Sequence, residues 1–317
     1  MKAQEVVEEF LVLIAKGEVE QAQEFIMENS RGNEQTISEQ LFSVSMLSLS
    51  DARYRIAMYS LEAALKIAPL EDMKKKIRLN LAVIYNDYAH FLSDMTEFDE
   101  AEEFFEKSIE VNPQYVIGHF SYAIYLCKMK RYDEAEQHYR SAIEIDSQFL
   151  EAYVNLGNLL ADTGNHKDAE LYYEEALEID PDDAGAHYNY AIYLRDMKRY
   201  DESKEHYKRV LEIDPEFLQA YINLGNLLSS RGNYEEAKLC YEKALEIDPD
   251  DARIHYNCAC LLKEMKRFDE AEEHYRKAIE IDPNFASAHN NLILLLVEMN
   301  RHDEAREQYK EALKRLG

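Results

Sequence analysis

The chain has few of the residues that make turns and cross-links. Its 317 residues include 9 glycines, 6 prolines, 4 cysteines and no tryptophan. A turn-rich all-β protein needs turn residues every 8–12 positions, so this composition excludes one. The cysteines Cys127, Cys240, Cys258 and Cys260 lack the spacing of a disulfide framework, which favours a reducing cytoplasm. Ala, Leu, Glu and Lys dominate the long segments, and these residues favour helices.

Basic residues and long apolar runs are also scarce. The chain has 36 Lys and Arg against 63 Asp and Glu, a formal net charge of −27. Nucleic-acid affinity depends on clustered basic residues, so we expect no nucleic-acid and no membrane partner. The longest apolar run, Leu292 to Val297, is far shorter than the roughly 20 residues of a membrane span. The N-terminus shows no signal-peptide pattern. We therefore predict a cytoplasmic protein, whose acidity either steers a basic partner or only maintains solubility.

Sequence motifs of enzymes are missing. There is no glycine-rich phosphate loop, no GxSxG, no HExxH and no CxxC. Acidic pairs such as Glu174-Glu175 are numerous and fit solvated helix faces better than a general acid and base. We therefore predict that the chain is not an enzyme and that it holds no cofactor.

One pattern recurs every 34 residues. A small residue is followed four places later by an aromatic residue and three places after that by another small one. The first small residue is Ala135, Ala169, Ser203, Ala237 and Ala271 in five successive copies, and the aromatic residue is Tyr139, Tyr173, Tyr207, Tyr241 and Tyr275. Intervals of four and three place these residues on one helix face. A second stripe upstream, such as Leu156, Gly157 and Leu160, predicts another helix, so each copy is a helical hairpin.

The pattern resembles the tetratricopeptide repeat family from Ala82 to Leu316, over seven units. The resemblance implies an all-α, right-handed superhelical solenoid of helix-turn-helix hairpins. Residues 1–81 fit the pattern poorly, and we expect them to form an irregular helical N-terminal cap with one or two degenerate hairpins. The array is similar to the superhelices of the O-linked N-acetylglucosamine transferases and kinesin light chains, without a catalytic domain.

An asparagine stands at the same place in the first helix of five consecutive units. These residues are Asn155, Asn189, Asn223, Asn257 and Asn291. The resemblance implies that this place faces the concave groove, where an asparagine ladder holds an extended peptide by its main chain. One amide offers both a donor and an acceptor to a peptide unit. The alternative is a harmless polar residue inherited through duplication of the repeats.

A second stripe follows three residues after the ladder. It reads Asn158, Ile192, Asn226, Cys260 and Leu294. Because it faces the same groove, its alternating character would suit a ligand with alternating polar and apolar side chains. In some members of the family a clamp of basic residues grips the C-terminal carboxylate of chaperones. Arg253 is the one base at the corresponding places here, so a chaperone-tail receptor is disfavoured.

Histidines recur in pairs 19 residues apart. The pairs are His119 with His138, His187 with His206, and His255 with His274. A zinc site needs three or four converging ligands. His187 takes a slot that is aromatic in neighbouring units, so we interpret these residues as packing residues and predict no metal site.

Together these patterns predict a protein-interaction scaffold or adaptor that binds an extended peptide or partner protein in an asparagine-lined groove. Two alternatives remain. The chain could self-assemble into homo-oligomers through uncapped ends, where the run Leu292 to Val297 supplies apolar surface. It could also be the non-catalytic arm of a larger enzyme.

Overall fold

The computed structural model describes residues 1–45 and 51–316. Over these residues the chain forms eighteen α-helices and no β-strand, which confirms the all-α prediction. The helices are α1 (Ala3–Ala15), α2 (Val19–Asn29), α3 (Glu34–Ser45), α4 (Asp51–Ile67), α5 (Glu71–Asp94), α6 (Phe98–Val111), α7 (Val116–Lys128), α8 (Tyr132–Ile145), α9 (Leu150–Asp162), α10 (His166–Ile179), α11 (Ala184–Asp196), α12 (Tyr200–Ile213), α13 (Leu218–Ser230), α14 (Tyr234–Ile247), α15 (Ala252–Glu264), α16 (Phe268–Ile281), α17 (Ala286–Glu298) and α18 (His302–Leu316).

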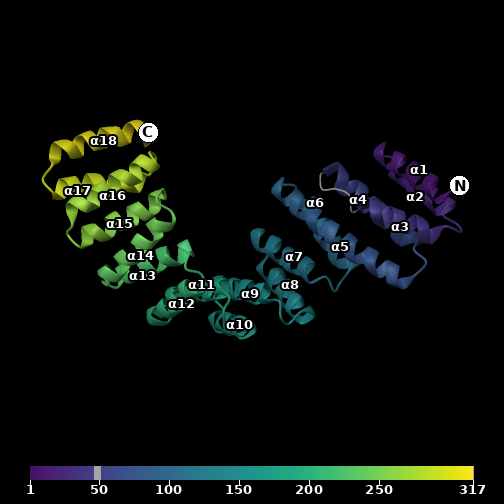
Figure 1. Ribbon diagram of the computed structural model, residues 1–317, viewed down its shortest axis with the longest axis horizontal. Helices are drawn as coiled ribbons and strands as arrows, with labels where there is room; N and C mark the ends of the chain where they lie inside the picture. The colour runs from purple at the N-terminus through teal and green to yellow at the C-terminus, as the bar shows by residue number, and fades with distance from the viewer. Residues whose placement is uncertain (46–50, 317) are drawn as a thin grey trace. The chain divides into compact units, whose positions relative to one another are not determined.

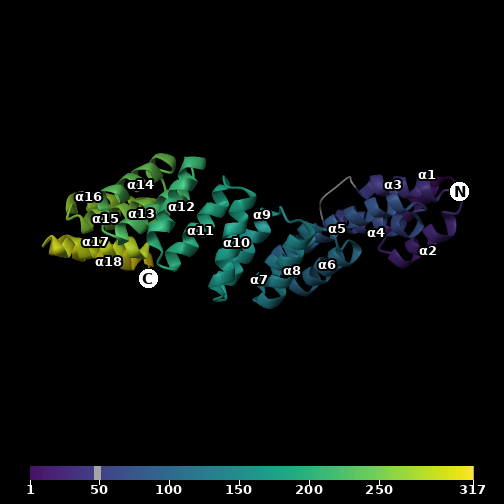
Figure 2. The same ribbon diagram turned by 90° about the horizontal axis from the view of Figure 1, so that it is seen from below.

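The helices fall into two compact units, Met1–Ala169 and Glu170–Gly317. In the first unit, α1 pairs with α2, α3 with α4, α5 with α6 and α7 with α8. In the second, α11 pairs with α12, α13 with α14, α15 with α16 and α17 with α18, and each hairpin packs against the next. The last pair, α17 and α18, lies side by side in both Figure 1 and Figure 2. The predicted solenoid of hairpins is thus confirmed.

Each regular hairpin turns through a residue in the left-handed region. Gly164 has φ 86° and Gly232 has φ 79°, and both lie in the short turn between the two helices of a hairpin. Alternate hairpins place a lysine there instead, with φ 62° at Lys198 and 60° at Lys266. Glycine adopts this conformation without steric cost, whereas lysine is strained by it. The turn geometry is therefore constant although its sequence alternates.

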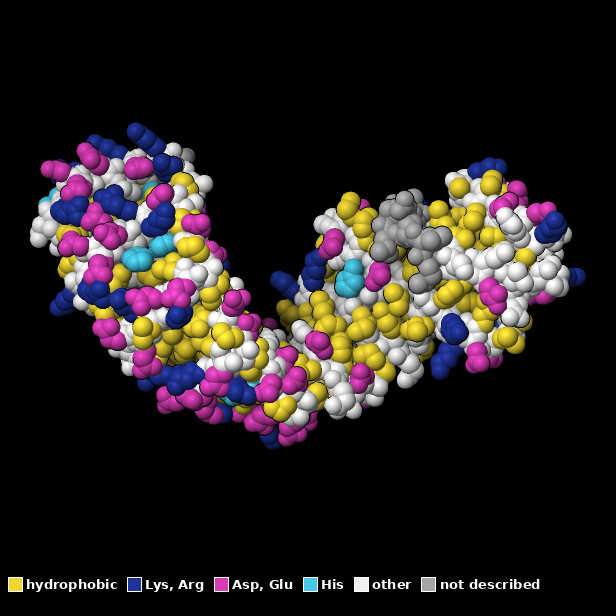
Figure 3. All heavy atoms as spheres, in the orientation of Figure 1, with side chains coloured by type: hydrophobic (Ala, Val, Ile, Leu, Met, Phe, Trp, Pro, Cys, Tyr) yellow, Lys and Arg dark blue, Asp and Glu magenta, His cyan; other side chains and the backbone are white. Residues whose placement is uncertain are grey.

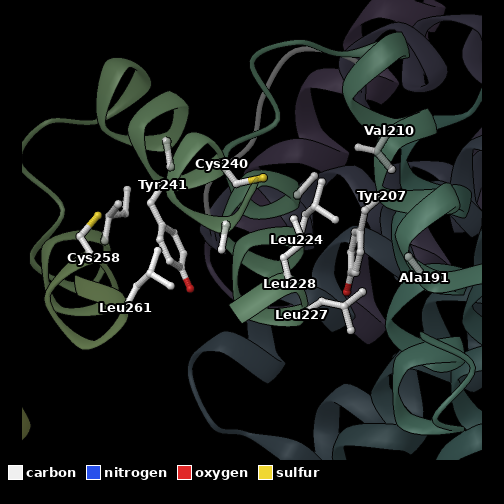
Figure 4. Close-up of a cluster of buried hydrophobic side chains, with 14 residues drawn as sticks. Ala191, Tyr207, Val210, Leu224, Leu227, Leu228, Cys240, Tyr241, Cys258 and Leu261 are labelled. Carbon is white, nitrogen blue, oxygen red and sulfur yellow. The ribbon is translucent and has the colours of Figure 1, made fainter. Parts of the chain in front are cut away.

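Small residues allow the two helices of a hairpin to approach closely. A Cβ atom added at Gly225 of α13 would lie 2.6 Å from Cε1 of Tyr241 on α14, so only glycine fits against this ring. Figure 4 shows the surrounding cluster, in which Leu224 and Leu228 of α13 lie between Tyr207 and Tyr241. This is the close packing expected from the repeat pattern.

The N-terminal segment differs in helix length. Helix α5 has 24 residues, whereas the first helices of the later hairpins have 13. Residues 71–80 lengthen this helix at its start, and the predicted division at residue 81 falls inside it. Before α5, two hairpins bury Phe10, Ile26, Ile37 and Leu41.

We expect Tyr207→Ala to lower the free energy of unfolding by about 3–5 kcal/mol, because it empties a fully buried site. Tyr309 holds the same place in the last hairpin but is 55% exposed. Tyr309→Ala should therefore cost less than about 1 kcal/mol. Urea unfolding followed by circular dichroism measures both, and equal losses would show that this place contributes by something other than burial.

Candidate functional site

A cleft opens on the first helices of the second unit. Its volume is about 350 Å³. It is lined by Gln219, Ile222 and Asn223 from α13, Arg253, Tyr256 and Asn257 from α15, and Phe285 just before α17. The cleft therefore brings together two asparagines of the predicted ladder with four neighbours that the sequence did not single out and one, Arg253, that it set aside.

Asn257 differs from the other ladder residues in the hydrogen bonding of its side-chain amide. Its side chain is partly buried, and it makes no hydrogen bond with any residue that the structure describes. The residue on the preceding hairpin that could reach it is Ile222, which lines the same cleft and has no polar side-chain atom. Asn257 therefore keeps both a donor and an acceptor for a ligand.

The side-chain amides of Asn223 and Asn291 each donate one hydrogen bond to the neighbouring hairpin. Nδ2 of Asn223 donates to the hydroxyl of Tyr188 at 2.9 Å, and Nδ2 of Asn291 donates to the hydroxyl of Tyr256 at 3.0 Å. Each bond joins one hairpin to the preceding one, 35 residues earlier. Two of the ladder asparagines thus link hairpins, and each retains its amide oxygen for other contacts.

The remaining two ladder residues bond within their own helices. Nδ2 of Asn189 donates to the carbonyl of Gly185 at 2.8 Å. In the first unit, Nδ2 of Asn155 donates to the carbonyl of Glu151, also at 2.8 Å. Such bonds to the preceding turn are a local alternative to ligand contacts. Neither residue lines the cleft on α13 and α15.

The second predicted stripe has a structural role in part. The hydroxyl of Tyr241 donates to Oδ1 of Asn226 at 2.6 Å, and that of Tyr275 donates to Sγ of Cys260 at 3.4 Å. Ile192 packs against the core cluster, and Asn158 of α9 in the first unit is partly buried. Leu294 is 57% exposed. Two members of the stripe thus position buried tyrosines, and none of its members lines the cleft.

Arg253 supplies the one charged group in the cleft lining. Its Nη2 lies 2.6 Å from Oδ2 of Asp251, and its Nε lies 3.1 Å from Oδ1. Asp251 also caps α15 by accepting the backbone N–H of Arg253 at 2.7 Å. The hydrogen bond from the Arg253 side chain lowers the pKa of the Asp251 carboxyl, so the pair stays charged.

The paired histidines bond through their Nδ1 atoms. In the second unit these atoms are 2.8 Å apart in His187 and His206 and 2.9 Å apart in His255 and His274. Nε2 of His187 lies 3.0 Å from the carbonyl of Pro181. A carbonyl only accepts, so Nε2 of His187 carries the proton and its Nδ1 accepts from His206.

The last hairpin fixes the same proton arrangement with a different residue. Nε2 of the Gln308 amide lies 2.8 Å from Nδ1 of His289, and an amide nitrogen can only donate. The equivalent pair in the first unit, His119 and His138, is 3.1 Å apart. Over residues 1–45 and 51–316, no cluster of three or more His, Cys, Asp or Glu is placed to hold a metal ion. The histidines are thus placed as interhelical hydrogen-bond pairs.

We predict that acid weakens the fold through these pairs. Burial and the charge that His187 would carry lower the pKa of His206 from 6.5 to about 4. The pKa of His274 is lowered for the same reasons, with burial the larger. The unfolded chain takes up these protons first, so the stability present above pH 6.5 is lost as the pH falls towards 4.

A double variant, His206→Gln and His274→Gln, tests this. It copies the Gln308 arrangement and keeps the donor to the first-helix histidine. Its melting temperature should fall less than that of the parent between pH 7.5 and 5.5, where most carboxylates do not yet titrate. An equal fall in both proteins would place the acid sensitivity elsewhere.

Comparison with known families identifies the repeat. A sequence profile described as tetratricopeptide repeat matches residues 80–148, 115–182, 182–250 and 216–284, and a second profile with the same description matches 262–316. Together they cover more than half of the chain. The chain belongs to the tetratricopeptide repeat family. The predicted resemblance is thereby confirmed.

Two solved structures with TM-scores above 0.5 show the same fold, and a third is similar over part of the chain. The pilF protein of Pseudomonas aeruginosa is 18% identical over 67% of this chain and 97% of its own, with a TM-score of 0.56. Cut9 with Hcn1, an APC/C heterotetramer, is 17% identical over 93% of this chain and 64% of that chain, with a TM-score of 0.55. YrrB, described as a TPR protein with an unusual peptide-binding site, is 25% identical over 59% of this chain and 96% of its own, with a TM-score of 0.48.

No curated protein matches the sequence. Tetratricopeptide arrays are typically non-catalytic scaffolds for protein–protein interaction, and this chain has that architecture. None of the helices described is both long enough and apolar enough to cross a membrane.

Proposed function

We propose that this chain is an interaction scaffold that binds an extended peptide segment in the cleft on α13 and α15. The observation that carries the proposal is Asn257, a partly buried amide that has no hydrogen-bond partner among the described residues and lines a cleft. The amide is only partly buried and lies at a surface cleft, so a bound peptide can reach both its donor and its acceptor. The cleft volume of about 350 Å³ lies at the lower end of ligand sites and fits a few residues of peptide.

Main-chain recognition explains the chemistry of the lining. Asn257 can donate to a peptide carbonyl and accept from a peptide N–H, and the free amide oxygen of Asn223 adds a second acceptor. Ile222 and Phe285 flank these amides and would contact side chains of the bound segment. Asn189 and Asn291 hold the same register in neighbouring hairpins of the unit and would extend the contact to a longer segment. Under this proposal Asn226, Cys260 and Ile192 act on the fold more than on the ligand, and Leu294 is exposed outside the cleft.

Asn257→Ala should weaken binding of a partner captured with the intact chain by about 0.5–1.5 kcal/mol, or about 2- to 13-fold. Its melting temperature should stay within error of the parent, since the amide has no partner in the described part of the chain.

Asn223→Ala should weaken binding and also reduce stability by about 0.5–1.5 kcal/mol, because it breaks the bond to Tyr188. The control is Asn226→Ala, outside the cleft, which should leave affinity unchanged. Calorimetric titration and thermal melts give both quantities. If Asn257→Ala binds as tightly as the parent, the cleft is not the binding site.

A second candidate function is self-association through the last hairpin. On α17 and α18, Leu294, Tyr309 and Leu313 are each more than half exposed, and a hollow of about 500 Å³ is lined in part by Ile293, Val297 and Tyr309. Exposed apolar patches of this kind favour association. The predicted apolar run contributes only in part, because Leu295 and Leu296 are fully buried in the core.

At tens of micromolar, sedimentation equilibrium should then show species larger than the 37.1 kDa chain. Replacing both Leu294 and Leu313 by Glu should restore the single-chain mass, because it places charge on the apolar face. A parent protein that remains at 37.1 kDa would remove this candidate.

We also propose that residues 1–81 cap the array and that residues 82–316 form seven tandem repeats. The two hairpins of α1 to α4 support a capping role, since they bury an apolar core of their own and α4 packs against α5. A cytoplasmic location belongs to the same proposal and is supported by the four free cysteines.

A further inference from the structure

We infer that the cleft on α13 and α15 selects an internal peptide segment in which an acidic side chain stands near an apolar one. This inference rests on the proposed function and names the class of its ligand. It is the opposite of what the net charge of −27 favours, which is a basic partner. The inference is based on the residues that line the cleft and not on the total charge of the chain.

The first step is the orientation of Arg253. Nε and Nη2 of its guanidinium face Asp251, and no residue that the structure describes accepts a hydrogen bond from Nη1. A guanidinium is a planar fork with five N–H donors, so holding one edge presents the other in a defined direction. Asp251 thus orients Arg253 and leaves donors for a ligand.

The second step is the exposure of the two partners. The Arg253 side chain is 72% exposed, whereas that of Asp251 is 9% exposed. Oδ1 of Asp251 also accepts a hydrogen bond from the backbone N–H of Arg253. The surface that a ligand meets is therefore the free edge of the guanidinium and not the carboxylate. Carboxylates bind such an edge with two parallel hydrogen bonds, which is a short-range, directional contact.

The third step is the absence of acidic groups from the cleft walls. Apart from Arg253, the lining consists of Gln219, Ile222, Asn223, Tyr256, Asn257 and Phe285, all uncharged. Asp248 acts on Arg253 through its charge but does not line the cleft, so a lysine side chain in the cleft would meet no carboxylate in this lining and would face Arg253. Elsewhere on the second unit, acidic and basic side chains are interspersed, as the face in Figure 3 shows. The cleft thus differs from its surroundings.

The fourth step is the apolar part of the lining. The rings of Phe285 and Tyr256 pack with centroids 5.0 Å apart, which fixes Phe285 at the cleft edge, and Ile222 lies in the same lining. In an extended peptide, side chains two residues apart point to the same side. An acidic residue with an apolar residue two places away therefore matches Arg253 and the Phe285 side of the cleft.

The experiment is a selection from a display library of random internal 10-residue peptides, with both ends fused so that no free carboxylate is present. The intact chain is compared with Arg253→Ala, with Arg253→Lys and with the double variant Asn223→Ala, Asn257→Ala. The matched control is Arg276→Ala, since Arg276 on α16 is also paired with a carboxylate, Glu272, and lies outside the cleft.

We expect the parent and Arg276→Ala to enrich peptides with Asp or Glu two places from an apolar residue. Arg253→Ala should reduce that enrichment at least tenfold, and Arg253→Lys should restore part of it, because it keeps the charge but loses the fork. Thermal melts confirm that each variant is folded.

Two results would overturn the inference and are distinguishable. The ligand class is wrong if the parent enriches basic peptides, or if Arg253→Ala keeps the acidic preference. The proposed function stands in either case as long as the Asn223 and Asn257 double variant abolishes selection. If no enriched peptide depends on Asn223 and Asn257, the proposed function fails together with the inference.

Discussion

The array depends on the fit of one tyrosine per hairpin against a small residue of the neighbouring helix. Tyr241 lies so close to Gly225 that a Cβ atom there would overlap its ring. Tyr207 and Tyr275 hold the same place in adjacent hairpins and are fully buried. This contact sets the distance between the two helices of a hairpin, and the apolar faces that it leaves open are covered by the next hairpin. The first helices then stand in register, and it is on them that the cleft forms.

A 68-residue alternation is superimposed on this packing and determines which polar groups remain available. Tyr188 and Tyr256 stand in every second hairpin and accept hydrogen bonds from Asn223 and Asn291 of the hairpins that follow. Asn257 follows a hairpin that has Ile222 at that place, so its amide has no such partner. The same side-chain type therefore links hairpins in one repeat and is open to a ligand in the next. A ladder of identical residues need not be a ladder of identical contacts.

The sequence was sufficient for the fold and only partly sufficient for the site. The 34-residue period, the tyrosines and the small residues predicted the hairpins and their core, because those contacts repeat and depend on residue size. The ladder was recognised from its register, but register cannot show that Asn189 bonds to its own helix while Asn257 does not. The histidine pairs were recognised from their 19-residue spacing, and the structure joins each pair by a hydrogen bond. Their shared proton arrangement could be assigned only once the Pro181 carbonyl and Gln308 were seen beside them.

The cleft shows why total charge is a weak guide to a partner of such a scaffold. Long-range steering follows the sum of all charges and is screened within about 8–10 Å at physiological ionic strength. Selection at a cleft follows the few groups that a bound segment touches, and here those are a guanidinium edge, three amides, a tyrosine and two apolar side chains. Asp251 offsets most of the long-range field of Arg253 while fixing its direction, so the pair adds little to the rate of encounter and much to the geometry of contact. The negative field of the whole chain can thus govern how partners approach, while the basic group in the cleft, Arg253, governs which of them bind.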